Sequence, residues 1–364
     1  MKNVLGNVVT MTLFGESHGK TIGATLDGIL PGILVNEDFI KSQLSKRRPK
    51  NKIETARKEA DSFQIVSGVF NGYTTGEALT ILIENNDIRS KDYDKTKDLL
   101  RPGHADYTTY IKSNGYNDYR GGGHTSGRLT APIVALGAIL IDAFKQKNIY
   151  IGTHIKKCGQ VYDREFNNLE KDLIDLSNKD FPVLNDIEND IYKEIEQVAL
   201  KNDSIGGILE TVIYGLPKGL GEPWFSSVES KLSQAIFGIG AVKGIEFGEG
   251  FNFSNLLGSQ SNDSFYVENN NIKTKTNHNG GINGGITNGM PVLFRTAIKP
   301  TPSIGLPQDT VNINTKENEV LEITGRHDPA IIRRMAVVID SITAIVLADL
   351  LAIRYGNNFL SFEE

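Results

Sequence analysis

Two long apolar segments constrain the fold of this 364-residue chain more than any other feature. Residues 130–147 carry apolar side chains on every side of a helix, and residues 329–354 have the same character. A helix that is apolar all round has to be covered by other elements, so both segments are predicted to be buried helices. Acidic and small residues at helical spacing within them argue against membrane spans.

The rest of the chain is rich in short strand patterns. The first 90 residues alternate β-rich runs with turns, and residues 207–297 return to strands punctuated by glycine. Asn36 is predicted to cap a helix that ends before Pro49, and residues 163–203 predict two exposed amphipathic helices. Strands separated by buried helices, without regular βαβ alternation, indicate an α+β fold. No composition break marks a linker, so we expect one domain over residues 1–364.

Composition narrows the class of protein. The hydrophobic fraction of 39% supports a substantial core, and the net charge of −5 disfavours a nucleic-acid partner. The N-terminus has no apolar run long enough for a signal peptide, and Cys158 is the single cysteine. We therefore expect a cytoplasmic protein with no disulfide and no membrane partner.

The histidines are unevenly distributed. A lone histidine is usually structural, but five of the six lie in loops rich in glycine or charge, which makes the group a candidate for catalysis. His154 is the exception and lies in a strand-like run. The absence of HxxxH or HxH spacing predicts that no metal is bound. The five loop histidines are His18, His104, His124, His278 and His327.

Arginines accompany these loops. Arginine binds phosphate and carboxylate groups bidentately, although solvated surface charge is the alternative for any one of them. In "RGGGHTSGR", residues 120–128, three glycines would expose backbone N–H groups beside cationic side chains. The pattern predicts a ligand with several acid groups. The arginines concerned are Arg47, Arg48, Arg101, Arg120, Arg128, Arg326, Arg333 and Arg334.

Two further glycine-rich segments differ in specificity. "GIGAVKG", residues 238–244, mimics a dinucleotide-binding turn, but the run before it has helical spacing, whereas that turn requires a preceding strand. "NHNGGINGGITNG", residues 277–289, leads to "KPTPS", residues 299–303, which adds a charge, two hydroxyls and two stiffening prolines. A glycine-rich hairpin with a rigid exit is the structural alternative for the second segment.

Taken together, the motifs resemble the chorismate synthase family. Ten blocks follow the family's order over nearly the full chain, and this combination is specific to it. They include "FGESHG" (14–19), "KRRP" (46–49), "RPGHAD" (101–106), "DYRGGGHTSGR" (118–128), "AVKGIEFGEGF" (241–251), "KPTPSI" (299–304) and "GRHDPA" (325–330).

The resemblance implies a fold and a reaction. The fold is a layer of helices between two antiparallel sheets, assembled as a homotetramer. The reaction is the 1,4-anti elimination of phosphate from 5-enolpyruvylshikimate 3-phosphate to give chorismate, the last step of the shikimate pathway. Reduced FMN is the implied cofactor and the reaction has no net redox change.

The resemblance also implies site residues. His18 would protonate the departing phosphate, His104 would maintain the protonation state of the reduced flavin, and Asp328 would assist proton removal at C6. The substrate contacts would be Arg48, Arg101, Arg128 and Arg334. The FMN contacts would be His124, Thr125, Ser126, Gly240, Ala241, Gly284, Lys299, Pro300, Thr301, Pro302, Ser303 and Arg326.

Two positions depart from the commoner family pattern: His124 and Lys52 stand where many members have arginine.

Two other functions are alternatives to that of a chorismate synthase. "GIGAVKG" motivates an NAD(P)-dependent oxidoreductase as the alternative enzyme, and a noncatalytic flavin- or anion-binding module is the alternative of another class. Whether NADPH or an external reductase would reduce the flavin is left open by the sequence.

Overall fold

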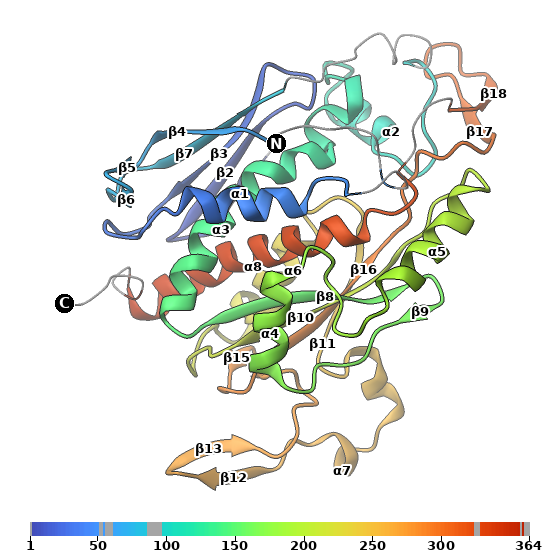
Figure 1. Ribbon diagram of the computed structural model, residues 1–364. Coiled ribbons are helices and arrows are strands. Elements are labelled where there is room, and N and C mark those ends of the chain that lie inside the picture. The colour runs from blue at the N-terminus through green and yellow to red at the C-terminus, as the bar shows by residue number, and fades with distance from the viewer. Residues whose placement is uncertain are drawn as a thin grey trace.

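Two five-stranded antiparallel sheets enclose a layer of helices in the computed structural model, which describes residues 2–50, 54, 61–85, 97–323, 328–356 and 359 (Figure 1). The first sheet is ordered β1 (Val4–Leu5), β2 (Thr10–Gly15), β3 (Thr21–Asp27), β7 (Leu79–Glu84), β4 (Phe63–Ser67). The second is ordered β11 (Val242–Phe247), β16 (Val292–Ile298), β10 (Gly207–Tyr214), β8 (Tyr150–Cys158), β9 (Val161–Tyr162). The predicted α+β sandwich is confirmed.

Alternation of apolar side chains explains the first sheet. In β7 the side chains of Leu79, Ile81 and Ile83 are fully buried, while those between them are less so. The buried face packs on α3 (Thr130–Gln146). Two strands of this sheet lead to residues that are discussed below: β2 ends just before His18, and β7 ends at Glu84, beside Asn85.

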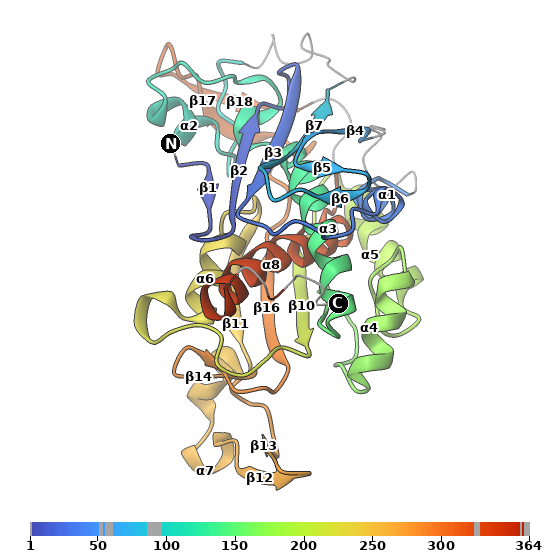
Figure 2. The same cartoon turned by 90° about the vertical axis from the view of Figure 1, so that its left-hand side faces the viewer.

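The second sheet is centred on β10. It pairs along its length with β8 on one side and β16 on the other, both antiparallel. Helix α8 (Ile332–Tyr355) packs across β8 and β10 and covers their inner face (Figure 2). This helix therefore lies between the sheet and α3.

Helices α3 and α8 are the two buried helices that the sequence predicts. They pack on each other, and Gly137 makes the close approach possible, because a Cβ there would lie 2.4 Å from the Ser341 Cβ. Helix α8 and the longer helical stretch Arg120–Gln146, which ends in α3, are apolar and long enough to span a membrane, but 89% and 83% of their apolar windows are buried inside the protein. Helix α8 begins at Ile332, three residues after the predicted start. Helix α6 (Val228–Ile236) packs on its other side.

The remaining helices follow their sequence signals. Helix α1 (Glu37–Lys46) begins after Asn36, whose Oδ1 accepts a hydrogen bond from the backbone N–H of Phe39 at 3.0 Å, as predicted. Helices α4 (Leu169–Asn178) and α5 (Glu188–Ala199) are the two amphipathic helices expected within residues 163–203. Each buries one apolar stripe and exposes its charged face.

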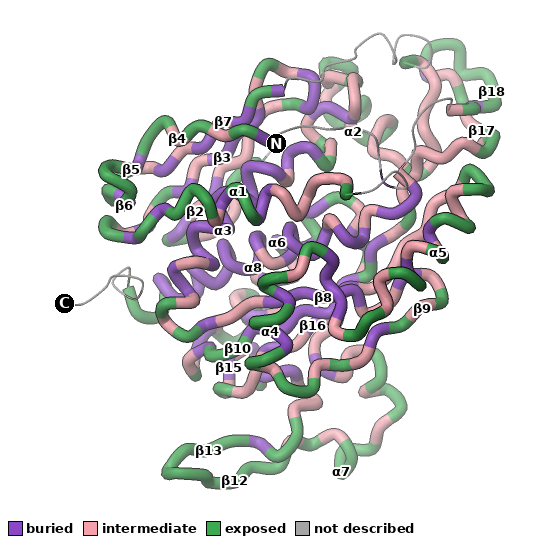
Figure 3. Tube along the Cα trace, in the orientation of Figure 1, coloured by how far each residue is buried: buried purple, intermediate pink, exposed green. Residues whose placement is uncertain are grey.

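Smaller elements extend from both sheets. One arm, formed by α7 (Gly258–Ser261), β12 (Phe265–Glu268) and β13 (Asn271–Thr274), projects from the second sheet and is exposed along almost its whole length (Figure 3). At the opposite end lie α2 (Asp106–Lys112), the 3₁₀ segments η2 (Arg120–Thr125) and η3 (Gly127–Leu129), and a β17–β18 hairpin (Gln308–Val311 and Asn318–Leu321). The other elements are η4 (Trp224–Ser226), η5 (Gly250–Asn255), and the hairpins β5 (Val69–Phe70) with β6 (Tyr73–Thr74) and β14 (Ile282–Asn283) with β15 (Ile286–Thr287).

Candidate active site

A cavity of about 740 Å³ lies where the ends of four helices meet, a volume typical of ligand pockets. The N-terminal turns of α3 and α8 line it together with the segments that follow α1 and α6. Helix N-termini carry partial positive charge, so α3 and α8 favour an anion here. The lining comes from within residues 47–49, 61, 103–108, 125–130, 237–243, 299–302 and 328–338.

Charge distinguishes this cavity from the rest of the molecule. Among the described residues, its lining has six cationic side chains and two carboxylates, although the chain as a whole has a net charge of −5. Such a local excess of positive charge attracts ligands with several acid groups. The cations are Arg47, Arg48, Arg128, Lys243, Lys299 and Arg334, and the carboxylates are Asp61 and Asp328.

The three consecutive glycines bring two histidines close together. Gly121, Gly122 and Gly123 have φ angles of 58°, 86° and 53°, which side chains disfavour. A Cβ on Gly121 would lie 2.3 Å from the His18 ring, and one on Gly122 would lie 3.3 Å from the His104 ring. Only glycine therefore allows the backbone to pass between these rings.

His104 lines the cavity and is oriented by a carboxylate. Its Nδ1 lies 2.7 Å from Asp106 Oδ1. Burial alone would raise the pKa of Asp106, but hydrogen bonds from Arg101 and His104 outweigh it and hold the pKa below its ordinary value. Asp106 and the Arg101 Nη2, at 3.1 Å, both contact Nδ1, so Nε2 is the ring nitrogen that they leave for a ligand.

Arg101 is engaged by the same carboxylate. Its Nε and Nη2 donate to Asp106 at 2.8 and 2.7 Å, and its side chain is not part of the cavity lining. The structure therefore places this predicted substrate contact behind His104, where it holds the histidine and Asp106 together.

His18 lies against the glycine loop. It is 5% exposed, its Nδ1 is 3.1 Å from Ser17 Oγ, and it is not part of the cavity lining. The three predicted catalytic residues are thus divided: His104 and Asp328 line the cavity, and His18 does not.

Asp328 and Arg334 form an ion pair in the cavity wall. Within the described part of the chain, Asp328 Oδ1 and Arg334 Nε are buried and have no hydrogen-bond partner. Burial lowers the pKa of Arg334 to about 10. Buried polar atoms without partners are costly, so these two atoms mark a place where a ligand would be favourable.

Asp61 joins two arginines, and no local sequence signal indicated it. Its Oδ2 accepts from Arg47 Nη1 at 2.9 Å, and its Oδ1 accepts from Arg128 Nη1. Arg128 also donates to Asn85 Oδ1 and to the Glu84 carbonyl, and its side chain is only 5% exposed. The predicted substrate contact Arg128 therefore lies in the cavity wall, with much of its hydrogen-bonding capacity directed at the protein.

The predicted cofactor contacts separate into two groups. Thr125, Ser126, Gly240, Ala241, Lys299, Thr301 and Pro302 line the cavity. His124, Gly284, Pro300 and Ser303 do not. The His124 Nδ1 lies 2.7 Å from the Gly15 carbonyl and holds the glycine loop to β2, while Gly284 lies in the turn of the β14–β15 hairpin. Arg326 and Lys52 lie outside the described residues.

The segment "KPTPS" ties the cavity wall together. Lys299 Nζ donates to the Gly103 carbonyl at 2.5 Å, and Thr301 Oγ1 donates to the Asp328 carbonyl at 2.6 Å. These contacts fix the loop that carries His104 and the residues before α8. The segment predicted to be rigid thus contacts Asp328 and the residue before His104.

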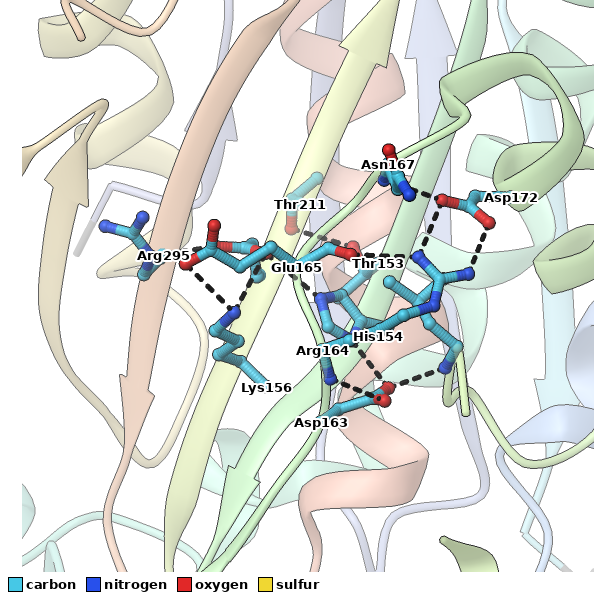
Figure 4. A network of polar contacts seen from close by, with 12 residues as sticks. Thr153, His154, Lys156, Asp163, Arg164, Glu165, Asn167, Asp172, Thr211 and Arg295 are labelled. Carbon is cyan, nitrogen blue, oxygen red and sulfur yellow. Dashed lines mark hydrogen bonds and ion pairs between the residues drawn. The ribbon is translucent and has the colours of Figure 1, made fainter. Parts of the chain in front are cut away.

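His154 belongs to a separate polar network in the second sheet (Figure 4). It is fully buried, with Nδ1 3.0 Å from Asp163 Oδ2 and Nε2 3.2 Å from Glu210 Oε1. Arg295 Nε donates to the other oxygen of Glu210 at 2.8 Å. None of these four residues lines the cavity. Among the described histidines, cysteines and acids, no group of three or more is arranged to hold a metal ion.

The sandwich and its large cationic cavity define a class of protein, an α+β enzyme with a site for an anionic small molecule. Comparisons with known proteins identify the family: the family model for chorismate synthase matches residues 9–352. A chorismate synthase of Dehalococcoides mccartyi is 43% identical over 358 residues, covering 98% of each chain. That of Pyrococcus abyssi is 43% identical over 351 residues, covering 96% of this chain and 97% of the other. The chain belongs to the chorismate synthase family.

A solved structure agrees with this assignment. A chain titled "Crystal Structure of Chorismate Synthase" matches with a TM-score of 0.76 at 28% identity, over 96% of this chain and 94% of the other. The predicted family and enzyme class are confirmed, and the alternative oxidoreductase is not favoured. "GIGAVKG" follows α6 instead of a strand, as its sequence context predicted.

Proposed function

We propose that this enzyme converts 5-enolpyruvylshikimate 3-phosphate to chorismate and phosphate by a 1,4-anti elimination that uses reduced FMN without net redox change. This is the last step of the shikimate pathway, which supplies aromatic amino-acid biosynthesis. The observation that supports it most is the cavity, where six cationic side chains from distant segments surround a volume of about 740 Å³. A substrate with one phosphate and two carboxylates needs such a concentration of positive charge.

The cavity fits a flavin mononucleotide. A Cβ on Gly127 or Gly240 would meet no atom within 4 Å, so flat backbone faces the space on two sides. Ile239, Met335 and Val338 add apolar surface for a ring. We propose that Thr125, Ser126, Gly240, Ala241, Lys299, Thr301 and Pro302 hold FMN, with the other predicted contacts outside the lining. When bound, reduced FMN supplies electron density that assists loss of phosphate from the substrate.

The chain's own residues have three proposed tasks. Arg48 and Arg334 bind the acid groups of the substrate from the cavity wall. His104, with its Nδ1 bound to Asp106, presents Nε2 to the cofactor and maintains its protonation state, while Asp328 assists proton removal at C6. His18 is the proposed general acid for the departing phosphate, although its side chain is not part of the cavity lining.

The assembly and surroundings of the enzyme are also proposals. We propose a single domain over residues 1–364, a homotetramer, and a cytoplasmic enzyme without nucleic-acid or membrane partners. Exposed aromatic side chains support an assembly, because Trp224, Phe225 and Phe251 are 83%, 92% and 84% exposed. NADPH is a proposed reductant of the flavin, with an external reductase as the alternative.

An anaerobic assay tests the reaction. Purified protein, dithionite-reduced FMN and the enolpyruvyl substrate should give chorismate, followed by its absorbance, with reductant needed only in catalytic amounts. Steady consumption of nicotinamide would instead indicate an oxidoreductase, and FMN binding without product would indicate a noncatalytic binding module. Replacing dithionite by NADPH in air tests the source of electrons separately.

A further inference from the structure

Arg333 is a buried arginine that takes no part in the proposed reaction. It is 4% exposed, lies in the first turn of α8, and is not part of the cavity lining. Its neighbour Arg334 does line the cavity. The two consecutive arginines thus lie in different surroundings: Arg334 lines the cavity and Arg333 does not.

Arg333 is bound by a buried carboxylate. Its Nε donates to Glu54 Oε1 at 2.5 Å and its Nη2 donates to Glu54 Oε2 at 2.6 Å, a bidentate pair. Glu54 is 7% exposed, and its Oε2 also accepts from the backbone N–H of Lys50 at 2.8 Å. Bidentate pairs of this kind hold both partners in one orientation.

The same guanidinium reaches the end of α1. Arg333 Nη1 donates to the Lys46 carbonyl at 3.0 Å, and Nη2 donates to the Arg48 carbonyl at 2.5 Å. Carbonyls in the last turn of a helix lack partners within the helix, and a cation there is favoured by the helix dipole. Arg333 therefore fixes the backbone of Arg48, whose side chain lines the cavity.

We propose that Glu54 and Arg333 are positioning residues that hold Arg48 and Arg334 in place to bind the acid groups of the substrate. One guanidinium and one carboxylate connect the exit of α1 to the start of α8, the two segments that carry these arginines. The inference rests on the proposed function for the identity of the substrate, but not for the positions of the two arginines. The negative charge of Glu54 also acts on Arg334 directly, opposing the effect of burial that lowers the pKa of Arg334.

The test compares Glu54→Gln with a matched control. Asp172 accepts a bidentate pair from Arg164 at 2.9 and 2.5 Å, is 4% exposed, and lies on α4 outside the cavity lining, so Asp172→Asn removes a bidentate pair on a buried carboxylate elsewhere. Both variants should lower the melting temperature. Only Glu54→Gln should raise the KM for substrate, by between about 10- and 100-fold, because small misplacements of binding groups have effects of this size. Its FMN Kd should equal the parent value.

A second variant and a second readout keep the two proposals separate. Arg333→Lys keeps the charge but has only three donors for the four hydrogen bonds that Arg333 makes, and it lacks the planar fork that binds a carboxylate bidentately. It should therefore raise KM in the same way, and it serves if Glu54→Gln does not fold. Calorimetric binding of inorganic phosphate should weaken in both variants, whether or not the parent makes chorismate. Unchanged KM and phosphate Kd, or an equal rise of KM in Asp172→Asn, would overturn the positioning role. If the parent protein makes no chorismate but both variants still bind phosphate more weakly than the parent, only the proposed reaction would be contradicted.

Discussion

Both the network around His154 and the cavity bury charged side chains, but they differ in how those side chains are satisfied. Each ring nitrogen of His154 meets a carboxylate, whereas Asp328 Oδ1 and Arg334 Nε meet no hydrogen-bond partner among the described residues. Burial alone would raise the pKa of Asp163 and of Glu210, but hydrogen bonds from His154 outweigh it and lower both. Complete pairing indicates a structural role and incomplete pairing a binding role.

The largest effect should come from the cavity. Asp328→Asn keeps the shape of the side chain but removes the charge beside Arg334, and we expect kcat to fall by about 10²- to 10⁴-fold, the range for a group that assists proton transfer. Steady-state kinetics in the anaerobic chorismate assay measure it. A variant that keeps parental kcat would show that the unpartnered oxygen has no part in the reaction.

The paired network should show the opposite behaviour. His154→Ala leaves Asp163 and Glu210 facing each other without the imidazole, so the free energy of unfolding should fall by about 3–5 kcal/mol. Urea unfolding measures this loss, and kcat/KM of the folded enzyme should stay at the parental value because the network lies outside the cavity lining. Loss of turnover without loss of stability would reverse the comparison.

Asp340 on α8 is a third kind of buried charged group. It lies beside the His154 network, but no residue of that network forms an ion pair with it. Thr153 Oγ1 donates to Asp340 Oδ1 at 2.6 Å, and burial raises the pKa of this carboxyl to about 7. The folded protein therefore keeps a proton that the unfolded chain loses above about pH 4. Stability should fall as pH rises from 4 to 7, by about 1.4 kcal/mol per pH unit.

Asp340→Asn should remove this pH dependence. Urea unfolding of parent and variant at several pH values between 5 and 8 would show the parent losing stability relative to the variant as pH rises. Parallel curves for the two proteins would contradict a proton held at Asp340.

The smallest effect should come from His124. Its ring bonds the Gly15 carbonyl, so His124→Ala should cost about 1 kcal/mol of stability and leave FMN affinity unchanged. Fluorescence titration of FMN measures the affinity. If His124→Ala clearly weakens FMN binding, His124 contacts the cofactor, as the family resemblance implies.

Elements with a strong local signal could be predicted from the sequence. The apolar pattern predicted the buried helices α3 and α8, and the cap at Asn36 predicted the start of α1. Both signals depend on residues that are close together in the sequence. The start of α8 is later than predicted because tertiary contacts hold the chain before it: the Asp328 carbonyl accepts from Thr301 and the Pro329 carbonyl accepts from the Ile205 backbone.

The site was predicted only in part. Motifs and resemblance nominated His104, Asp328 and Arg334, which the structure brings to one cavity. They missed Asp61 and Glu54, whose arginine partners lie as far as 67 and 279 residues away, a separation that leaves no local pattern. The resemblance nominated Arg101 as a substrate contact, and no sequence pattern indicated that its side chain pairs with Asp106, because that pair depends on the conformation of the loop.

A crystal structure of the enzyme with FMN and 5-enolpyruvylshikimate 3-phosphate would show whether the unpartnered atoms of the cavity bind ligand. Ligand atoms should lie within hydrogen-bond distance of Asp328 Oδ1 and Arg334 Nε, while the contacts of His154 should be unchanged. Ligands bound elsewhere, with those two atoms still lacking partners, would contradict it.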